Sequence, residues 1–430
     1  MKSNPSAWRK TKLKDVCDRI TVGYVGPMAD EYTPEGITFL RSQNITPFRL
    51  NLEDVKFIPA TFYTKIKKSA LKPGDVAVVR TGYPGTACVI PESLPDSNCA
   101  DLVVITPSKE LNSFYLAAIF NSAWGMASVR GNLVGVAQQH FNVGAAKEME
   151  VTLPPRAEQD RIAGILSAYD ELIENSQRRI RLLEDMARAL YREWFVHFRF
   201  PGHESVPHLP SALGNIPKGW ECVTLGSIIK VTHGCAFQGI HFSEEPTSRV
   251  LATPGNFRVG GGIKYDKLKF YSEQGPLESA YVFEPMDLMV TMTDLSKAGD
   301  TLGFPAFIPK LQSLTFLHNQ RIGRVLPVGE FFPKHYLYCL LCEERYRHHI
   351  VGGATGTAVK HTSPTRILSF PFASPKDAKL IHAFENFARP IFRQINNRIE
   401  ALENLRRTRD LLLPRLLNGQ ITTISNASPS

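Results

Sequence analysis

Polar side chains that can pair with nucleic-acid bases gather in six short stretches of the sequence, among them "FLRSQNITPFRL", "VRTGYPGT" and "TPGNFRVGGG". Arginine can pair with guanine, and asparagine or glutamine with adenine, through two hydrogen bonds each. Cationic side chains can also neutralise phosphates, and neighbouring glycines let a loop approach a duplex closely. The candidates for nucleic-acid contact are Arg41, Asn44, Arg80, Tyr83, Gln138, Gln139, His140, Asn256, Arg258, Thr293, Lys297, Lys360 and His361.

Each of these residues also has a plainer interpretation. A single arginine or asparagine in such a stretch could equally stabilise a loop or form an ion pair. His140 and His361 occupy similar surroundings in the two halves, but neither has neighbouring ligands that would make a metal site. Cys339 and Cys342 stand on one face of a predicted helix and are better explained by core packing than by metal binding. We therefore predict no metal site and no catalytic residue.

The composition places few limits on function. The chain has 430 residues, 43% of them hydrophobic, and a formal net charge of +9, which suits a polyanionic partner without requiring one. Its seven cysteines are scattered, as expected in a reducing cytoplasm. The first residues lack the apolar segment of a signal peptide, and no apolar run approaches the ~20 residues of a membrane-spanning helix. We expect a cytoplasmic protein with no membrane association.

Two long stretches have apolar residues at alternating steps of four and three, which is the pattern of helices that pair along their length. Ser176 and Arg398 interrupt the two series. These polar residues could fix the register of a coiled coil, or they could lie at the edge of the seam. The sequence alone allows the helices to pair in either direction. The predicted seam consists of Ile162, Leu166, Tyr169, Ile173, Ile180, Leu183, Phe384, Ile391, Ile395, Leu402, Leu405 and Leu412.

The two seams belong to an internal repeat. In the seams, a shift of 222 residues aligns Ile162 with Phe384 and Ser176 with Arg398. In the segments before the seams, a shift of 212 residues aligns "KPGDVAVVRTG" with "EPMDLMVTMTD", and Pro73 with Pro285. Short β-branched runs between turn residues predict β-rich domains of the α+β class. The predicted organisation is a first domain at 1–155, a helix at 156–198, a linker at 199–217, a second domain at 218–373, a second helix at 374–420 and a disordered tail at 421–430.

The aromatic cluster "YREWFVHF", from Tyr191 to Phe198, allows two interpretations. It could pack into the core of a domain, or it could form part of an interface with another protein. The arginines on both helices could likewise be solvated, dock a partner or contact DNA.

Several of these segments together resemble the specificity subunit of type I restriction–modification enzymes. They are "LPPRAEQDRIAGILSAYDELIE", "LLEDMARALYREWFVHFRFPG", "RIEALENLRRTRDLLLPRLLNGQI" and "LKPGDVAVVRTGYPGTACVI". The second half departs from the pattern, since it lacks the pair Glu158 and Gln159 and replaces Arg80, Thr81 and Gly82 with other residues.

The resemblance implies two target-recognition domains, separated by two conserved helices that pair as an antiparallel coiled coil. It implies that each domain reads one half of a bipartite, asymmetric target in double-stranded DNA. It also implies two methylation subunits that dock on the helices, and restriction subunits in the full complex. S-adenosylmethionine, ATP and magnesium are then expected on these partner subunits.

No phosphate-binding loop, S-adenosylmethionine site or nuclease carboxylate cluster is evident in the sequence. The chain is therefore expected to be a non-catalytic recognition subunit rather than an enzyme acting alone. The alternative is a coiled-coil scaffold that binds protein and not DNA.

Overall fold

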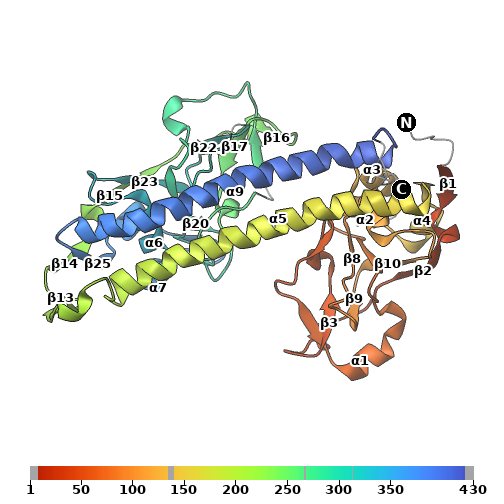
Figure 1. Ribbon diagram of the computed structural model, residues 1–430, viewed down its shortest axis with the longest axis horizontal. Coiled ribbons are helices and arrows are strands. Elements are labelled where there is room, and N and C mark those ends of the chain that lie inside the picture. The colour runs from red at the N-terminus through yellow and green to blue at the C-terminus, as the bar shows by residue number, and fades with distance from the viewer. Residues whose placement is uncertain (1–7, 134–139, 266–267, 312, 422–430) are drawn as a thin grey trace, which may run out of the picture. The chain divides into compact units, whose positions relative to one another are not determined.

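The computed structural model describes residues 8–133, 140–265, 268–311 and 313–421. The chain forms two compact units, one comprising residues 1–175 and 404–430 and the other comprising residues 176–403. Figure 1 shows the chain coloured from the N-terminus to the C-terminus, with its helices and strands labelled. Each of the two long helices contributes residues to both units. The fold therefore has two globular parts, as expected from the repeat.

The first unit is built on a four-stranded sheet, with strand order β2-β10-β7-β8. Successive side chains of the central strand β7 point to opposite faces of the sheet. Val76 and Val78 pack with helix α2, whereas Ala77 and Val79 pack in a second cluster. A strand that is buried on both faces has apolar residues at every position, which explains the sequence "VAVV" of β7. The sheet contains β2 (Cys17–Val22), β7 (Val76–Val79), β8 (Ala87–Val89) and β10 (Leu102–Pro107).

Smaller sheets and helices complete the first unit. Strands β6, β3 and β9 form a three-stranded sheet in which β3 and β9 are parallel. The remaining strands are β1 (Arg9–Lys12), β3 (Ile37–Leu40), β4 (Ile45–Thr46), β5 (Arg49–Leu50), β6 (Lys56–Ile58), β9 (Ser97–Cys99) and β11 (Glu150–Leu153). The helices are α1 (Ala60–Lys65), α2 (Ser113–Asn121), α3 (Ala123–Gly131) and α4 (Val143–Glu148).

The second unit repeats this topology. Its sheet has the order β15-β23-β19-β21, and Leu288 and Val290 of β19 pack in one cluster while Met289 packs in another. Strands β17 and β22 form the parallel pair that corresponds to β3 and β9. The main strands are β15 (Ile229–His233), β17 (Arg249–Ala252), β19 (Leu288–Thr291), β21 (Pro305–Phe307), β22 (Thr315–His318) and β23 (Ile322–Pro327).

Shorter elements frame this second sheet. Residues 199–217, expected to be a linker, contain a β-hairpin, and its Ile216 is buried. The other strands are β12 (His208–Ser211), β13 (Gly214–Pro217), β14 (Trp220–Thr224), β16 (Phe242–Ser243), β18 (Lys269–Tyr271), β20 (Thr293–Asp294), β24 (Lys360–His361) and β25 (Pro371–Pro375). The helices are α6 (Lys334–Leu341), α7 (Glu344–Gly352) and α8 (Pro364–Leu368).

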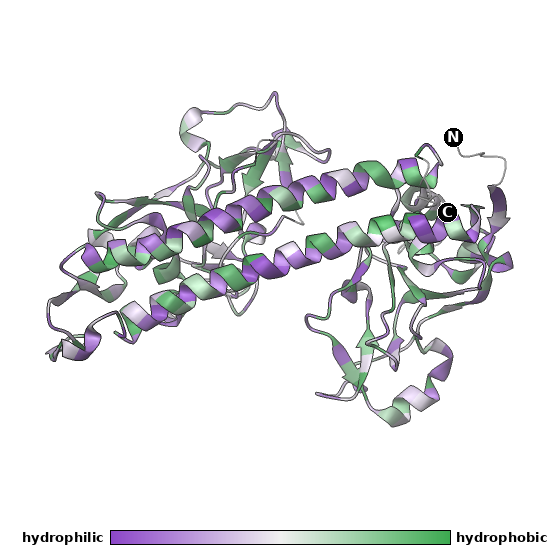
Figure 2. Cartoon of the chain, in the orientation of Figure 1, coloured by the Kyte–Doolittle hydropathy of each residue, from purple (hydrophilic) through white to green (hydrophobic). Residues whose placement is uncertain are grey.

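The long helices α5 (Arg156–Tyr191) and α9 (Lys379–Leu417) are antiparallel. In the first unit, Ile162 and Leu166 near the start of α5 pack in one cluster with Leu413 and Leu416 near the end of α9. In the second unit, the ring of Tyr191 at the end of α5 lies 5.8 Å from that of Phe384 near the start of α9. Figure 2 shows hydrophobic and hydrophilic residues alternating along both helices, as a one-sided apolar seam requires.

None of the predicted seam residues is exposed. Half-buried members are Tyr169, Leu183, Ile391, Leu405 and Leu412, and the other seven are buried. Ser176 and Arg398 are half-buried, and Nε of Arg398 has no hydrogen-bond partner among the described residues.

The helix ends differ somewhat from the ranges given by the sequence. A π-helical turn at Arg192–Val196 follows α5. Residues 374 and 375 belong to strand β25, which pairs with β14, so that α9 begins only at Lys379. Residues 422–430 of the expected tail lie outside the described residues.

Candidate nucleic-acid interface

One end of the four-stranded sheet in the first unit gathers several of the candidate residues. Strands β2 and β7 end there and β8 and β10 begin there, because neighbouring strands are antiparallel. Phe141 N donates a 3.1 Å hydrogen bond to the carbonyl of Arg80, and Nε of Arg80 donates one of 3.1 Å to the carbonyl of Phe141. The structure thus brings the Arg80 loop beside His140, although 60 residues separate them in sequence. Gln138 and Gln139 lie outside the described residues.

Arg80 is held inside this end of the sheet. Its Nη1 lies 3.4 Å from Oδ1 of Asp101, its side chain is 13% exposed, and Thr81 Oγ1 donates a hydrogen bond to the same carboxylate. The left-handed φ of +81° at Gly82 turns the chain outward immediately afterwards. Tyr83 follows at the tip of the loop and is 74% exposed. Arg80 therefore positions the loop, and Tyr83 is the side chain it presents.

The second unit has the same construction at the same end of its sheet. Thr362 N donates a 3.0 Å hydrogen bond to the carbonyl of Met292, as Phe141 does to Arg80. Strand β20 pairs with β24, so that Thr293 faces His361, and Thr293 Oγ1 lies 3.1 Å from Nδ1 of that histidine. Four predicted residues, Thr293, Lys297, Lys360 and His361, are thus found in one region.

Hydrogen bonds to Asp294 stabilise the loop that carries Lys297. The carboxylate of Asp294 accepts hydrogen bonds from the backbone of Ser296, at 2.7 Å, and from Thr301. Burial opposes ionisation of Asp294, but these hydrogen bonds outweigh it and lower its pKa. Arg347 donates to the carbonyls of Gly299 and Leu302. Lys297 is exposed at the tip of this fixed loop.

Two further residues at this end were not singled out in the sequence. Gln320 and Arg321 form the turn between β22 and β23, and both are exposed. Met292 N donates a 3.0 Å hydrogen bond to the carbonyl of Arg321, which places this turn beside the Thr293 strand. A polar turn between two apolar strands was the sequence signal that could have identified them.

Four other candidates perform structural tasks. Asn44 and Asn256 are fully buried at equivalent positions, and each caps a short 3-10 turn by accepting a hydrogen bond from the backbone N–H of Arg41 or Thr253. Arg41 pairs with Asp54, with 3.1 Å between Nη2 and Oδ2. Arg258 donates from Nη2 to both carboxylate oxygens of Glu184 on α5, at 2.5 Å each. These side chains hold loops rather than face solvent.

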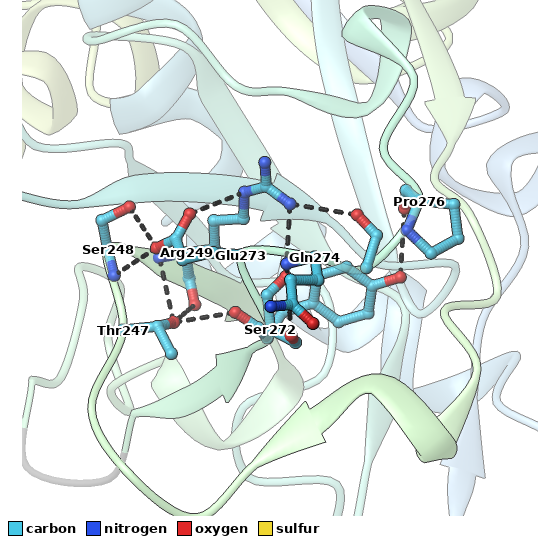
Figure 3. A network of polar contacts seen from close by, with 9 residues as sticks. Thr247, Ser248, Arg249, Ser272, Glu273, Gln274 and Pro276 are labelled. Atoms are coloured by element: carbon cyan, nitrogen blue, oxygen red, sulfur yellow. Dashed lines mark hydrogen bonds and ion pairs between the residues drawn. The ribbon is translucent and has the colours of Figure 1, made fainter.

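Arg249 shows the same use of a cation inside the fold (Figure 3). Its guanidinium lies 3.2 Å from Glu273 and donates hydrogen bonds to the carbonyls of Ser272 and Gly275. Ser248 donates to Glu273 from its backbone N–H and its hydroxyl, and these bonds lower the pKa of that carboxyl. The guanidinium of Arg249 therefore stabilises the turn after β18.

The described residues offer neither a metal site nor a membrane-spanning helix. No group of three or more histidine, cysteine, aspartate or glutamate side chains suited to a metal occurs among the described residues. Burial raises the pKa of the Cys342 thiol to about 12 and that of Cys339 well above its usual value. Within the same described ranges, no helix is long and apolar enough to cross a membrane.

Part of the chain matches a known domain family. Residues 5–185 match the family described as the type I restriction modification DNA specificity domain. The specificity subunit of type I restriction enzyme MjaIX from Methanocaldococcus jannaschii is 25% identical over 335 residues, which cover 74% of this chain and 71% of that protein. The MjaVIII specificity subunit of the same organism is 25% identical over 227 residues, covering 52% of this chain and 51% of that protein.

A solved structure shares the fold. The S subunit of a type I restriction–modification system from M. genitalium has a TM-score of 0.51 and 15% sequence identity, with 99% of both chains covered. These matches confirm the resemblance drawn from the sequence, which is to the specificity subunits of type I restriction–modification systems. They also confirm the expected fold of two repeated α+β domains with a pair of long helices.

Proposed function

We propose that this chain is the DNA sequence-specificity subunit of a type I restriction–modification enzyme, and that each globular domain reads one half of a bipartite target. The observation that carries this proposal is the repeated sheet end. In both units it combines the loop after the central strand with a segment that contains a histidine, His140 or His361. Such loops on a rigid sheet are suited to placing side chains against base edges.

The two sheet ends present different chemistry, which supports an asymmetric target. Tyr83 and Leu295 occupy equivalent positions in the repeat and are 74% and 65% exposed. The turn before the neighbouring strand contains Asp101 in the first unit and Gln320 and Arg321 in the second. Side chains with different hydrogen-bonding patterns select different base pairs in the major groove. The two halves of the target should therefore differ in sequence.

The long helices are proposed to dock two methylation subunits, with restriction subunits joining the full complex. Supporting this, large apolar side chains on the helices remain exposed outside the seam: Leu172, Leu182, Met186, Phe387 and Leu411. Exposed apolar side chains on a helix are suited to a protein interface. We further propose that this chain is non-catalytic and cytoplasmic, and that S-adenosylmethionine, ATP and magnesium bind to the partner subunits.

The aromatic cluster at the end of α5 does not supply most of this docking surface. Tyr191, Trp194 and Phe195 are buried in the core of the second unit. Of the two interpretations of this cluster, core packing therefore accounts for these three rings.

Mapping of modified bases tests the proposal. A methylation-free host would carry this chain with its methylation subunit, and a control host would carry the methylation subunit alone. We expect a split motif with a fixed gap only when this chain is present. A soluble complex that produces no motif would overturn the proposal and favour the coiled-coil scaffold.

A further inference from the structure

A pocket of about 190 Å³ opens at the surface of the second unit and shares no lining residue with the sheet end described above. Its walls come from the π-helical turn after α5, the hairpin β12–β13, the start of α7 and strand β25. Most of the lining residues are apolar or aromatic, polar atoms are also exposed in the pocket, and Glu343 contributes a carboxylate. Principal lining residues are Tyr191, Phe195, Phe198, Ile216, Phe370 and Glu343.

Glu343 is poorly matched to these surroundings. Its side chain is only 8% exposed, and it immediately precedes α7. Nε of Arg192 lies 4.0 Å from Oε1 of Glu343, which is too far for a hydrogen bond, and the Arg192 side chain is itself 53% exposed. Removing a carboxylate from water is costly unless a cation or several donors compensate it. The pocket therefore contains a negative charge that its closest cationic neighbour compensates weakly.

Unusual backbone geometry shapes the same wall. Residues 192–196 form a π-helical turn, and Phe198 has a φ of +59°, which a residue with a bulky side chain rarely adopts. The ring of Phe198 packs edge-to-face on Trp220, with 5.1 Å between the ring centres. Such turns and strained residues are concentrated at functional sites. This observation is independent of the charge on Glu343.

We propose that the pocket binds an organic cation, an ammonium or guanidinium group on an alkyl chain. The carboxylate of Glu343 would pair with the charge, and the rings of Tyr191, Phe195 and Phe198 would surround the alkyl part and offer their faces to the cation. Cavities of ~150 Å³ can accept a ligand the size of benzene, so this volume suits one side chain or a small amine. Arg345 is the other charged residue of the lining besides Glu343, and it is exposed, so water screens its repulsion of a bound cation.

Two matched controls make the test specific. The ligand probe is butylguanidine, and butylurea has the same shape without the charge. The protein control is Glu344→Gln, because the neighbouring Glu344 side chain is 85% exposed and does not line the pocket. Calorimetric titration of the full chain should detect butylguanidine and not butylurea. Glu343→Gln should weaken that binding by about tenfold, whereas Glu344→Gln should leave it unchanged.

The source of the natural cation is decided by a second measurement, the dissociation constant of the complex with the methylation subunit. If the cation is a lysine or arginine side chain of that subunit, Glu343→Gln should weaken assembly and butylguanidine should compete with it. If the cation is a free amine, assembly should be unchanged and the assembled complex should still bind butylguanidine. Either result supports the site.

The inference is overturned if Glu343→Gln and Glu344→Gln behave alike in both measurements, or if butylurea binds as well as butylguanidine. Melting temperatures of both variants establish that they are folded. Because the site is separate from the sheet end, its failure would leave the modified-base motif intact, and failure of DNA recognition would leave butylguanidine binding intact.

Discussion

Arg258 and Glu184 form an ion pair in which one nitrogen of the arginine contacts both carboxylate oxygens. The pair attaches a loop of the second domain to helix α5. Both carboxylate oxygens lie 2.5 Å from Nη2 of the arginine, and the Glu184 side chain is only 6% exposed. Burial raises the pKa of Glu184, and Arg258 opposes this shift. Arg188, one turn further along α5, donates to the carbonyl of Gly260 in the same loop.

The equivalent loop of the first domain also contacts a long helix, through different chemistry. Phe48 corresponds to Gly260 in the repeat. The centre of its ring lies 5.4 Å from the guanidinium carbon of Arg409 on α9, which lies over the ring face. Nη1 of Arg409 lies 2.7 Å from Oδ1 of Asp170 on α5. Each domain is thus attached to a helix of its own unit by the same turn.

Removal of the arginine should destabilise the second unit. Arg258→Ala leaves a buried carboxylate without its partner, which typically costs about 3 kcal/mol. Arg199→Ala removes an exposed pair with Glu193 and should cost less than about 1 kcal/mol. Urea denaturation of the full chain measures both variants. Equal losses in the two would show that the Arg258 pair does not hold this loop.

Stability should fall in mild acid because of His318. Burial lowers the pKa of this histidine to about 4 and outweighs the opposing effect of its 2.9 Å contact with the carbonyl of Ile322. Since the unfolded chain takes up the proton near pH 6.5, the stabilisation is complete above that value and is lost as the pH falls toward 4. The full effect is about 3 kcal/mol.

His318→Gln provides the check on this pH dependence. This variant should flatten the curve of unfolding free energy against pH between 6.5 and 4. A curve as steep as that of the original chain would assign the acid sensitivity to other groups.

Lys297 should contribute to DNA binding without regard to sequence. It is exposed at the tip of a fixed loop, where an ammonium group can contact phosphate. Lys297→Ala should weaken binding of the assembled complex to all duplexes and lower the slope of log affinity against log salt by about 1. Lys376 is also an exposed lysine and follows strand β25, and Lys376→Ala should change neither quantity. A salt slope unchanged by Lys297→Ala would remove this loop from the interface.

Tyr83 and Leu295 should each affect one half of the target. Tyr83→Ala should alter base preference or methylation only in the half read by the first domain, and Leu295→Ala only in the other half. Modified-base mapping with each variant distinguishes the two. An effect of either variant on both halves would contradict independent reading.

The long helices could be predicted from sequence because their seam depends on spacing alone. The roles of Asn44 and Asn256 could not, since a short amide that caps a turn and one that reads adenine use the same hydrogen-bonding groups. Arg258 looked like a base contact because its partner, Glu184, is distant in the sequence. Only the folded chain shows that this cation is already paired.

The repeated sheet end was predicted in parts and not as a whole. "VRTGYPGT" and the histidine segments were identified separately, and strand order brings them together. The polar turn that contains Arg321 could be recognised between two apolar strands, but its place at the sheet end comes from the hydrogen bond that its carbonyl accepts from Met292, which the sequence does not show.

Exchange of one domain tests the central claim most directly. Residues 1–155 would be replaced with the corresponding domain of a relative that has a different target, and modified bases would be mapped in a host with the methylation subunit. We predict that one half of the split motif changes while the other half remains as before. A motif in which both halves change, or in which neither half changes, would contradict the account of one domain for each half-site.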